Sequence, residues 1–345
     1  MRMLINARNR SVAIEDDCIV DCNGRFDVIL DCPELEVHPG LINAHDHLHR
    51  NHYGRLGAGL YANAYRWAED IQVRYRRSIE RGRGVQRREA LLAGAWKNLF
   101  AGVTTVVHHD RWETDFERDF PVRVARVASA DSLGMTERLD VPPSGPFCLH
   151  VGEGTDAVAA GELPILDAHG LIDERLIAVH GVGIEADHID RFSRSGAALV
   201  WCPTSNQFLF GRTAPAELLQ NIDVMLGSDS RLTGAGDILD EFQSARSLGL
   251  LTDERLTDAV GSTCARRLGL AEPSLEPDNN ADLILLGRPL IEARAEDVAL
   301  TVVAGVPRVA SADIARHLGP IADQGAAMRL GEVVRWANQQ GRNIR

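Results

Sequence analysis

Two histidines that lie one residue apart, His45 and His47, directly follow a short apolar run in the stretch HPGLINAHDHLHR, residues 38–50. Alternate side chains of a β-strand share a face, so both imidazoles would point the same way where the strand meets a polar loop. Imidazole is a common zinc ligand, and the pair therefore predicts half of a metal site. In a chain with 12 histidines such a pair also arises by chance, and it would then only mark the start of a polar loop.

Further histidines and carboxylates follow other apolar runs that are typical of β-strands. In chain order they are His108, His109, His150, Glu153, His180 and Asp229. A single histidine at a strand end is usually a satisfied polar group, but here the same residue types recur at strand after strand. Because an α/β barrel gathers the carboxyl ends of its strands on one face, we expect a shared metal site there.

The middle of the chain alternates strand-like runs with longer helical segments, which is the pattern of a parallel α/β architecture. The expected strands are 40–44, 103–108, 123–127, 147–151, 176–180, 198–201 and 224–227, and the expected helices include 85–101, 185–195 and 257–268. Seven strands are close to the eight of a (β/α)8 TIM-like barrel. The segment between Asp110 and Phe147 is short, so we expect a barrel that is distorted at its fourth position or has a short fourth strand there.

The two ends of the chain contain short strand-like runs separated by turns. Neither end is long enough to bury a core alone, so we expect residues 1–37 and 281–345 to combine as a small, split β-sandwich domain. Residues 38–280 would then form the barrel.

Composition limits the class of partner. The 345 residues carry 49 acidic and 37 basic side chains, a formal net charge of −12, which argues against binding to nucleic acid or to an anionic membrane. No apolar run is long enough to span a bilayer, and the opening residues lack the apolar core of a signal peptide. We expect a cytoplasmic homodimer with six free cysteines that acts on a small molecule.

Six motifs occur in a characteristic order: HPGLINAHDHLH, GVTTV, LHVGE, VHG, WCPTSNQFL and LGSDS. Together they resemble the amidohydrolase superfamily, and within it the branch of cytosine deaminase, guanine deaminase, S-adenosylhomocysteine deaminase and the triazine hydrolases. The CPTSN segment and the His-x-x-Glu pair point to that branch. Near the end of the chain, GSTCARRLGL and ADLILL are similar to the segments through which the family returns to its split β-sandwich.

The resemblance implies one divalent metal ion, with zinc favoured and iron or manganese as alternatives. Its implied ligands are His45, His47, His150 and Asp229. Glu153 matches the family's proton shuttle. His180 matches a histidine that orients the attacking water or the substrate, although in relatives with two metals it is a ligand.

A second metal would usually require a carboxylated bridging lysine from a barrel strand. The only lysine of the chain, Lys97, lies in a helical stretch, so one metal is expected.

These residues predict a hydrolase that acts on carbon–nitrogen bonds other than peptide bonds. Zinc lowers the pKa of bound water to about 7. Asp229 would take the water's proton, Glu153 would protonate a ring or amidine nitrogen, and ammonia would leave. The favoured function is hydrolytic deamination of an aminated heterocycle or cyclic amidine. The alternatives are an amidohydrolase that releases no ammonia and a catalytically silent scaffold.

Four residues are candidates for binding the substrate: Arg55, Trp67, His180 and Asn206. Arg55 lies in the loop after the first strand, where it would pair with a carboxylate or phosphate or else be solvated. Trp67 would stack on a planar ring or pack against the barrel. Asn206, in the CPTSN segment, would bind the substrate or else have a structural role.

Overall fold

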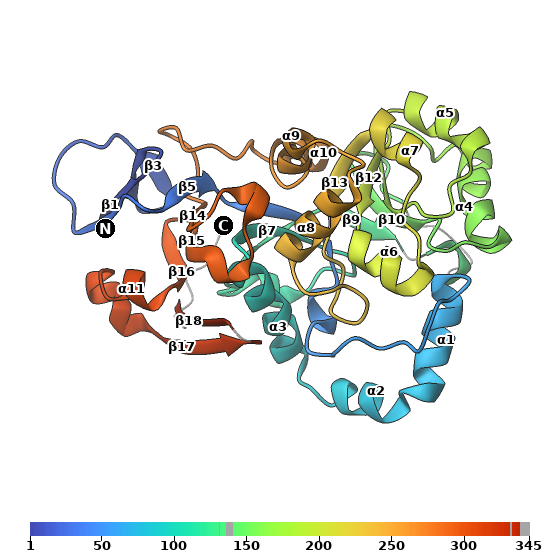
Figure 1. Ribbon diagram of the computed structural model, residues 1–345, viewed down its shortest axis with the longest axis horizontal. Helices are drawn as coiled ribbons and strands as arrows, with labels where there is room; N and C mark the ends of the chain where they lie inside the picture. Colours follow the sequence, from blue (N-terminus) through green and yellow to red (C-terminus); the bar gives the residue numbers. More distant parts are fainter. Residues whose placement is uncertain (131, 136–140, 332, 339–345) are drawn as a thin grey trace.

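The computed structural model describes residues 1–130, 132–135, 141–331 and 333–338 (Figure 1). The chain is an α/β protein with two parallel sheets in its middle and two further sheets formed by its ends. The fold class expected from the alternation of strands and helices is therefore confirmed at this level.

In the described part of the chain, eight parallel strands form the two central sheets. They are β6 (Leu41–Asp46), β7 (Val103–His108), β8 (Arg123–Ala125), β9 (Ala128–Ala130), β10 (Phe147–Val151), β11 (Leu176–His180), β12 (Ala198–Trp201) and β13 (Asp223–Leu226). The strand orders are β6-β7-β8 and β9-β10-β11-β12-β13. Every residue of β6, β7, β10, β11 and β12 is buried, as parallel strands that are covered on both faces require.

The expected strands 103–108, 147–151, 176–180 and 198–201 match the observed strands from end to end. Strand β9 was not expected, because its three residues, Ala-Ser-Ala, form no apolar run. It pairs in parallel with β10, with Ala128 opposite Phe147. The short segment before β10 therefore does contain a strand, although residues 136–140 of that segment lie outside the described residues.

Helices and short 3-10 turns connect these strands. The α-helices of this region are α1 (Ala64–Arg74), α2 (Arg76–Arg83), α3 (Arg87–Phe100), α4 (Ala157–Ala168), α5 (Ala186–Arg194), α6 (Pro203–Phe210), α7 (Ala216–Asn221), α8 (Ile238–Leu248), α9 (Asp253–Asp258) and α10 (Ser262–Leu268). The single helix expected over 257–268 is wrong. The chain is interrupted at Gly261, whose φ of −141° and ψ of −106° are not helical, and it forms α9 and α10 instead.

Strands from both ends of the chain share one sheet. Its members are β5 (Glu36–Pro39), β14 (Leu283–Leu286), β15 (Val298–Val303), β16 (Val306–Ala310), β17 (Gly325–Leu330) and β18 (Val333–Asn338). Strand β5 pairs antiparallel with β14, with Val37 opposite Leu285. The other terminal sheet contains β1 (Arg2–Ala7), β2 (Ser11–Glu15), β3 (Cys18–Val20) and β4 (Val28–Cys32). Met3 and Ile5 of this sheet belong to the same apolar core as Leu285, so the two ends bury one another.

The short helix α11 (Ala312–Ala315) follows β16. All six cysteines are free. No helix within the described ranges is long and apolar enough to cross a membrane.

Candidate metal centre

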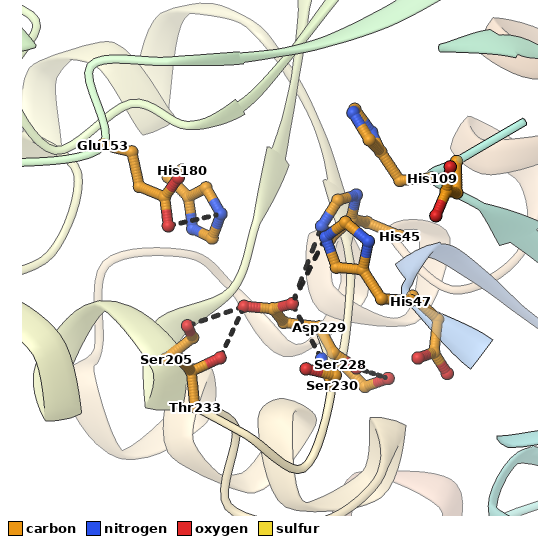
Figure 2. Close-up of polar contacts among 12 residues, drawn as sticks. His45, His47, His109, Glu153, His180, Ser205, Ser228, Asp229, Ser230 and Thr233 are labelled. Atoms are coloured by element: carbon orange, nitrogen blue, oxygen red, sulfur yellow. Dashed lines mark hydrogen bonds and ion pairs between the residues drawn. The ribbon is translucent and has the colours of Figure 1, made fainter. Parts of the chain in front are cut away.

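The candidate metal ligands come from the carboxyl ends of parallel strands that lie far apart in the sequence. His45 lies in β6 and His47 directly follows that strand, while His150 lies in β10. Asp229 lies three residues past the end of β13. Figure 2 shows the side chains of His45, His47 and Asp229 pointing toward one another. All four side chains are buried.

The geometry of this group fits a metal ion. One nitrogen from each of His45, His47 and His150 lies within 4.8 Å of the others. The Nε2 atoms of His45 and His47 lie 3.8 and 3.9 Å from Oδ1 of Asp229. Both ring nitrogens of His45 and Nδ1 of His47 are buried without a hydrogen-bond partner among the described residues. Buried polar atoms normally have a partner, and an imidazole binds a metal ion through one ring nitrogen, so an ion beside Asp229 would supply a partner for Nε2 of His45.

The charge state of the histidines also suits a metal. Burial lowers the pKa of His45, His47 and His150 well below the ordinary value, so the three rings are neutral near pH 7. Neutral imidazole is the form that donates a lone pair to a metal ion.

Asp229 is held in place by hydrogen bonds to both of its oxygens. Ser205 Oγ and Thr233 Oγ1 donate to Oδ2 at 2.8 and 2.7 Å, and the backbone N–H of Ser230 donates to Oδ1 at 2.7 Å (Figure 2). Burial opposes ionisation of Asp229, but the neighbouring His45 and these donors outweigh it and keep its pKa below the ordinary value. The carboxylate is therefore charged and oriented before any ligand binds.

Glu153 and His180 form a pair beside the ligand group. His180 Nε2 lies 3.4 Å from Oε1 of Glu153 (Figure 2). Burial raises the pKa of Glu153 to about 7, although the neighbouring His180 opposes this shift. A carboxyl group with such a pKa can both give and take a proton near neutral pH.

Asn206 fixes the orientation of His180 from behind. Its Oδ1 lies 2.9 Å from Nδ1 of His180, and its Nδ2 donates to the backbone carbonyl of the same residue at 3.4 Å. Because the amide oxygen only accepts, Nδ1 of His180 carries a proton in this contact, and Nε2 is the ring nitrogen that faces Glu153. His180 also has a φ of +77°, a conformation rarely adopted by residues other than glycine and often found at functional sites.

The predicted substrate-binding residues do not all reach the same place. A cavity of about 770 Å³ opens over the candidate ligands, and its lining includes Trp67, whose Nε1 donates to the backbone oxygen of Leu56 at 2.7 Å. Asn206 is buried behind His180 and lies outside this lining. Arg55 also lies outside it, because its Nε donates to the backbone oxygen of Gly234 at 3.2 Å and its guanidinium covers the ring of Phe208.

A buried lysine lies next to the ligand group, although its sequence position gave no sign of this. Lys97 Nζ, from helix α3, lies 3.0 Å from Oδ2 of Asp46 and donates to Ser228 Oγ and to the backbone oxygen of Asp229, both at 2.9 Å. These three contacts use all three protons of the ammonium group. Lys97 therefore serves as a support for the chain at Asp229 rather than as a metal bridge.

Two asparagines complete this network around Asp46. Asn51 Nδ2 donates to Oδ1 of Asp46 at 2.8 Å, and Asn98 Nδ2 donates to Oδ2 at 2.7 Å. Asn43 links Asn98 to Ser228 through its Nδ2, at 2.8 and 2.7 Å. No motif in the sequence identifies these residues as partners, because they are brought together only by the packing of α3 against the strands.

His109 also lies beside the ligand group, although its position in the sequence indicated no specific role. Its ring centroid lies 4.1 Å from that of His150 and 4.9 Å from that of His45. Nε2 contacts the backbone oxygen of Ala130 at 3.2 Å, so Nε2 must carry the proton. Nδ1 is buried without a partner among the described residues, and the ring lines the cavity.

Several curated proteins that are similar to this chain are deaminases. It is 31% identical over 164 residues to the 5-methylthioadenosine/S-adenosylhomocysteine deaminase of Halobacterium salinarum, a match that covers 41% of this chain and 37% of that relative. It is 23% identical to the 5'-deoxyadenosine deaminase of Methanothermobacter thermautotrophicus, with 81% of each chain covered. The first match thus spans little more than a third of the relative's own length. No protein-family model matches the chain.

Solved structures share the fold of this chain. The atrazine chlorohydrolase of Arthrobacter aurescens TC1, solved with zinc, superposes with a TM-score of 0.67 at 18% sequence identity, and the superposition covers 88% of this chain and 94% of that one. At such low identity this likeness shows a shared fold. With the deaminase relatives, it confirms that the chain resembles the deaminase and triazine-hydrolase branch of the amidohydrolase superfamily.

Proposed function

We propose that this protein is a metal-dependent hydrolytic deaminase that acts on an aminated heterocycle or a cyclic amidine. The observation that carries the proposal is a buried group of neutral histidines and one charged aspartate, with unpartnered nitrogens, beside a glutamate whose pKa is raised to about 7. The deaminases among its relatives support the choice of reaction.

The metal would be held by His45, His47, His150 and Asp229. Three neutral imidazoles and a carboxylate suit zinc, and the zinc in the structurally similar chlorohydrolase supports that choice over iron or manganese. When bound, such an ion lowers the pKa of a water molecule to about 7 and so supplies a nucleophile at neutral pH.

The protein's own residues would move the protons. Asp229 accepts a proton from the attacking water, and its hydrogen bonds to Ser205 and Thr233 keep it aimed during this step. Glu153 protonates a ring or amidine nitrogen, which makes the adjacent carbon more electrophilic. As the carbonyl forms, the hydroxyl group added to that carbon returns a proton to Glu153, and the proton held by Asp229 passes to the leaving amine, which departs as ammonia. His180, oriented by Asn206, positions the water or the substrate at its Nε2 atom.

We also propose a closed barrel for residues 38–280 and a separate β-sandwich domain for residues 1–37 and 281–345. A hydrogen bond of 3.1 Å from the backbone N–H of Asp229 to the oxygen of His45 supports closure, because it joins the segment after β13 to β6. The pairing of β5 with β14 supports a terminal domain that draws on both ends of the chain.

The first experiment combines metal analysis with a screen for ammonia release. Purified protein should contain close to one zinc ion per chain, and the zinc-loaded protein should release ammonia from at least one member of a panel of aminated purines, pyrimidines, pterins and cyclic amidines. Release of a different group without ammonia would favour a non-deaminating amidohydrolase. Failure to bind zinc, iron or manganese would favour a scaffold and contradict the proposal.

The second experiment isolates Glu153. The Glu153→Gln variant should keep its metal and lose activity by about 10²- to 10⁴-fold, because it removes the proton carrier but not a ligand. Glu69→Gln, on the exposed surface of α1, is the matched control and should keep full activity. Wild-type turnover by Glu153→Gln would show that another group moves the proton.

A further inference from the structure

Arg50 points to a feature of the substrate that the proposed chemistry does not require. It ends the short turn η1 (Leu48–Arg50), three residues after His47, and it lines the cavity over the candidate metal ligands. Its guanidinium is partly buried and forms no hydrogen bond or ion pair with any residue that the structure describes. A guanidinium in a cavity with its five N–H donors unused is available to a ligand.

The charge of Arg50 acts on the reacting end of the cavity. Burial is the main cause that lowers the pKa of His47, and the charge of Arg50 is the next largest. The same charge also lowers the pKa of His150 and opposes the rise in the pKa of Glu153, although burial dominates in both cases. Arg50 shares the lining of one cavity with His47, Glu153 and Asp229, so its side chain lies in the cavity where the reaction would take place.

A nearby acid of the cavity lining is engaged elsewhere. Asp110 faces His49 Nε2 at 3.4 Å and Arg87 at 3.8 Å. Arg87 in turn is bonded to Glu113. Asp110 thus has donors of its own. Burial opposes its ionisation and the charge of Arg50 is one of several causes that lower its pKa, but the two side chains form no ion pair within the described residues.

The group formed by His49, His108 and Asp110 does not offer a second metal site instead. The backbone N–H of Leu48 donates to Nδ1 of His108 at 3.2 Å. The neutral His108 ring must then carry its proton at Nε2, which therefore has no lone pair for a cation. With Arg50 and Arg87 also nearby, this side of the cavity suits an anion better than a cation.

We propose that Arg50 binds an oxyanionic group, a carboxylate or a phosphate, carried by the heterocyclic substrate. This inference rests on the proposed function. A planar guanidinium binds either oxyanion through two parallel hydrogen bonds. The place of Arg50 beside His47 puts that group on the ring or close to it, and a cavity of about 770 Å³ has room for a bicyclic ring with such a substituent.

Binding to a catalytically blocked protein tests the inference without turnover. Zinc-loaded Glu153→Gln protein would be titrated calorimetrically with two matched pairs, pterin against pterin-6-carboxylate and adenosine against adenosine 5'-monophosphate. In at least one pair the anionic member should bind more tightly. Adding Arg50→Met should weaken that member by about 10- to 100-fold, the usual value of a charge-assisted hydrogen bond, and leave the neutral member unchanged. The pair that responds identifies carboxylate or phosphate as the ligand chemistry.

Three further variants serve as controls for the effect of Arg50→Met on binding. Arg50→Lys should retain part of the preference because it keeps the charge but loses the planar pair of donors. Arg66→Met, an exposed arginine bonded to Glu69 on α1, removes the same charge outside the cavity and should change nothing. Arg83→Met removes a second arginine from the cavity lining, one that is bonded to Gln72. Melting curves of all variants establish that each is folded.

Several results would overturn the inference. They are equal binding of both members in each pair, an equal loss for both members in Arg50→Met, or a preference that depends on Arg83 and not on Arg50. An assay of ammonia release by the active protein separates the role of Arg50 in binding from the proposed reaction. If binding of the anionic compounds depended on Arg50 but no compound released ammonia, only the deaminase function would be refuted. If ammonia were released but the anionic compounds were not preferred, only the role of Arg50 would be refuted.

Discussion

Two buried polar clusters meet at Ser228 and Asp229, and they differ in how many of their polar atoms have hydrogen-bond or ion-pair partners. On one side, the candidate ligand group leaves nitrogens of His45 and His47 without partners among the described residues. On the other, Lys97 and Asp46 take part in a network in which each charged group has several close partners. Unpartnered polar atoms are costly in a protein interior, so the first cluster is built for something that binds there and the second for support.

The difference also explains why the second cluster can position the first. The backbone oxygen of Asp229 accepts from Lys97, while its side chain points into the ligand group (Figure 2). Asp229 has a φ of +50°, which is uncommon for a residue other than glycine and must be maintained by its surroundings. The supporting network thus holds a strained residue in the conformation that the metal would need.

The largest expected effect comes from removing a ligand. His45→Ala should lose its metal and more than about a thousandfold of the activity, because the nucleophile depends on the ion. The metal-free variant should nevertheless fold, since the deleted ring makes no hydrogen bond with a described residue, and its loss of stability should be that of a small buried cavity. Metal analysis, ammonia release and denaturant unfolding measure the three quantities. A variant that still held metal with full activity would exclude His45 from the ligand set.

Removing Lys97, which supports the chain at Asp229, should mainly reduce the stability of the fold. Lys97→Met leaves the carboxylate of Asp46 buried without its cation, which should lower the free energy of unfolding by about 3–5 kcal/mol. Burial already raises the pKa of Asp46 and Lys97 opposes that rise, so without the lysine the pKa rises further. Because more of Asp46 must be ionised in the folded variant as the pH rises, the free energy of unfolding of Lys97→Met should fall further below that of the wild type at pH 8 than at pH 5.

Urea unfolding of the metal-free protein at both pH values measures this effect of Lys97→Met. Arg76→Met, which breaks an exposed pair with Glu80, is the control and should have little effect at either pH. If the two variants were equally stable, the network around Lys97 would not support the fold.

A substitution of Asn206 tests whether its contact with His180 matters for catalysis. Asn206→Ala removes the acceptor that orients His180, and kcat should fall by about 10- to 100-fold with the metal retained and KM little changed. Asn206→Asp restores an acceptor for Nδ1 of His180 and should recover part of the activity. Steady-state kinetics with metal analysis decide the matter, and equal kcat in wild type and Asn206→Ala would rule out a positioning role.

The last prediction concerns Glu241, a buried carboxyl group that accepts hydrogen bonds from Thr204, and its effect should appear only as a dependence of stability on pH. Burial raises its pKa to about 8, although the hydroxyl and backbone N–H of Thr204 donate to it and oppose the shift. Its folded pKa lies above the unfolded value of about 4.3, so its stabilising contribution is complete below that value and is lost as pH rises toward 8.

Glu241→Gln should therefore reduce the loss of stability between pH 5 and pH 8 by up to about 3–4 kcal/mol. Denaturant unfolding of the metal-free protein across this range measures the slope. Identical pH profiles for the variant and the wild type would mean that Glu241 is not protonated more readily in the folded state.

Much of the architecture could be predicted because it depends on local patterns. Fully buried parallel strands leave continuous apolar runs, and the ends of those runs are visible in the sequence, as for 147–151 and 176–180. Strand β9 escaped prediction because pairing with β10, rather than its own composition, makes it a strand. The helix expected over 257–268 failed because a glycine in a non-helical conformation divides it.

The sequence by itself determined which residue types follow each strand, and hence that His45, His47, His150, Glu153, His180 and Asp229 would lie at one end of a parallel sheet. Only the tertiary structure decided which other side chains reach that place. Lys97 arrives from a helix, Arg50 lines the cavity without forming an ion pair with any residue that the structure describes, and Arg55 turns toward Gly234 and Phe208. The reason is physical: strand periodicity fixes the face on which a side chain lies, whereas contacts between loops and helices depend on packing across long sequence separations.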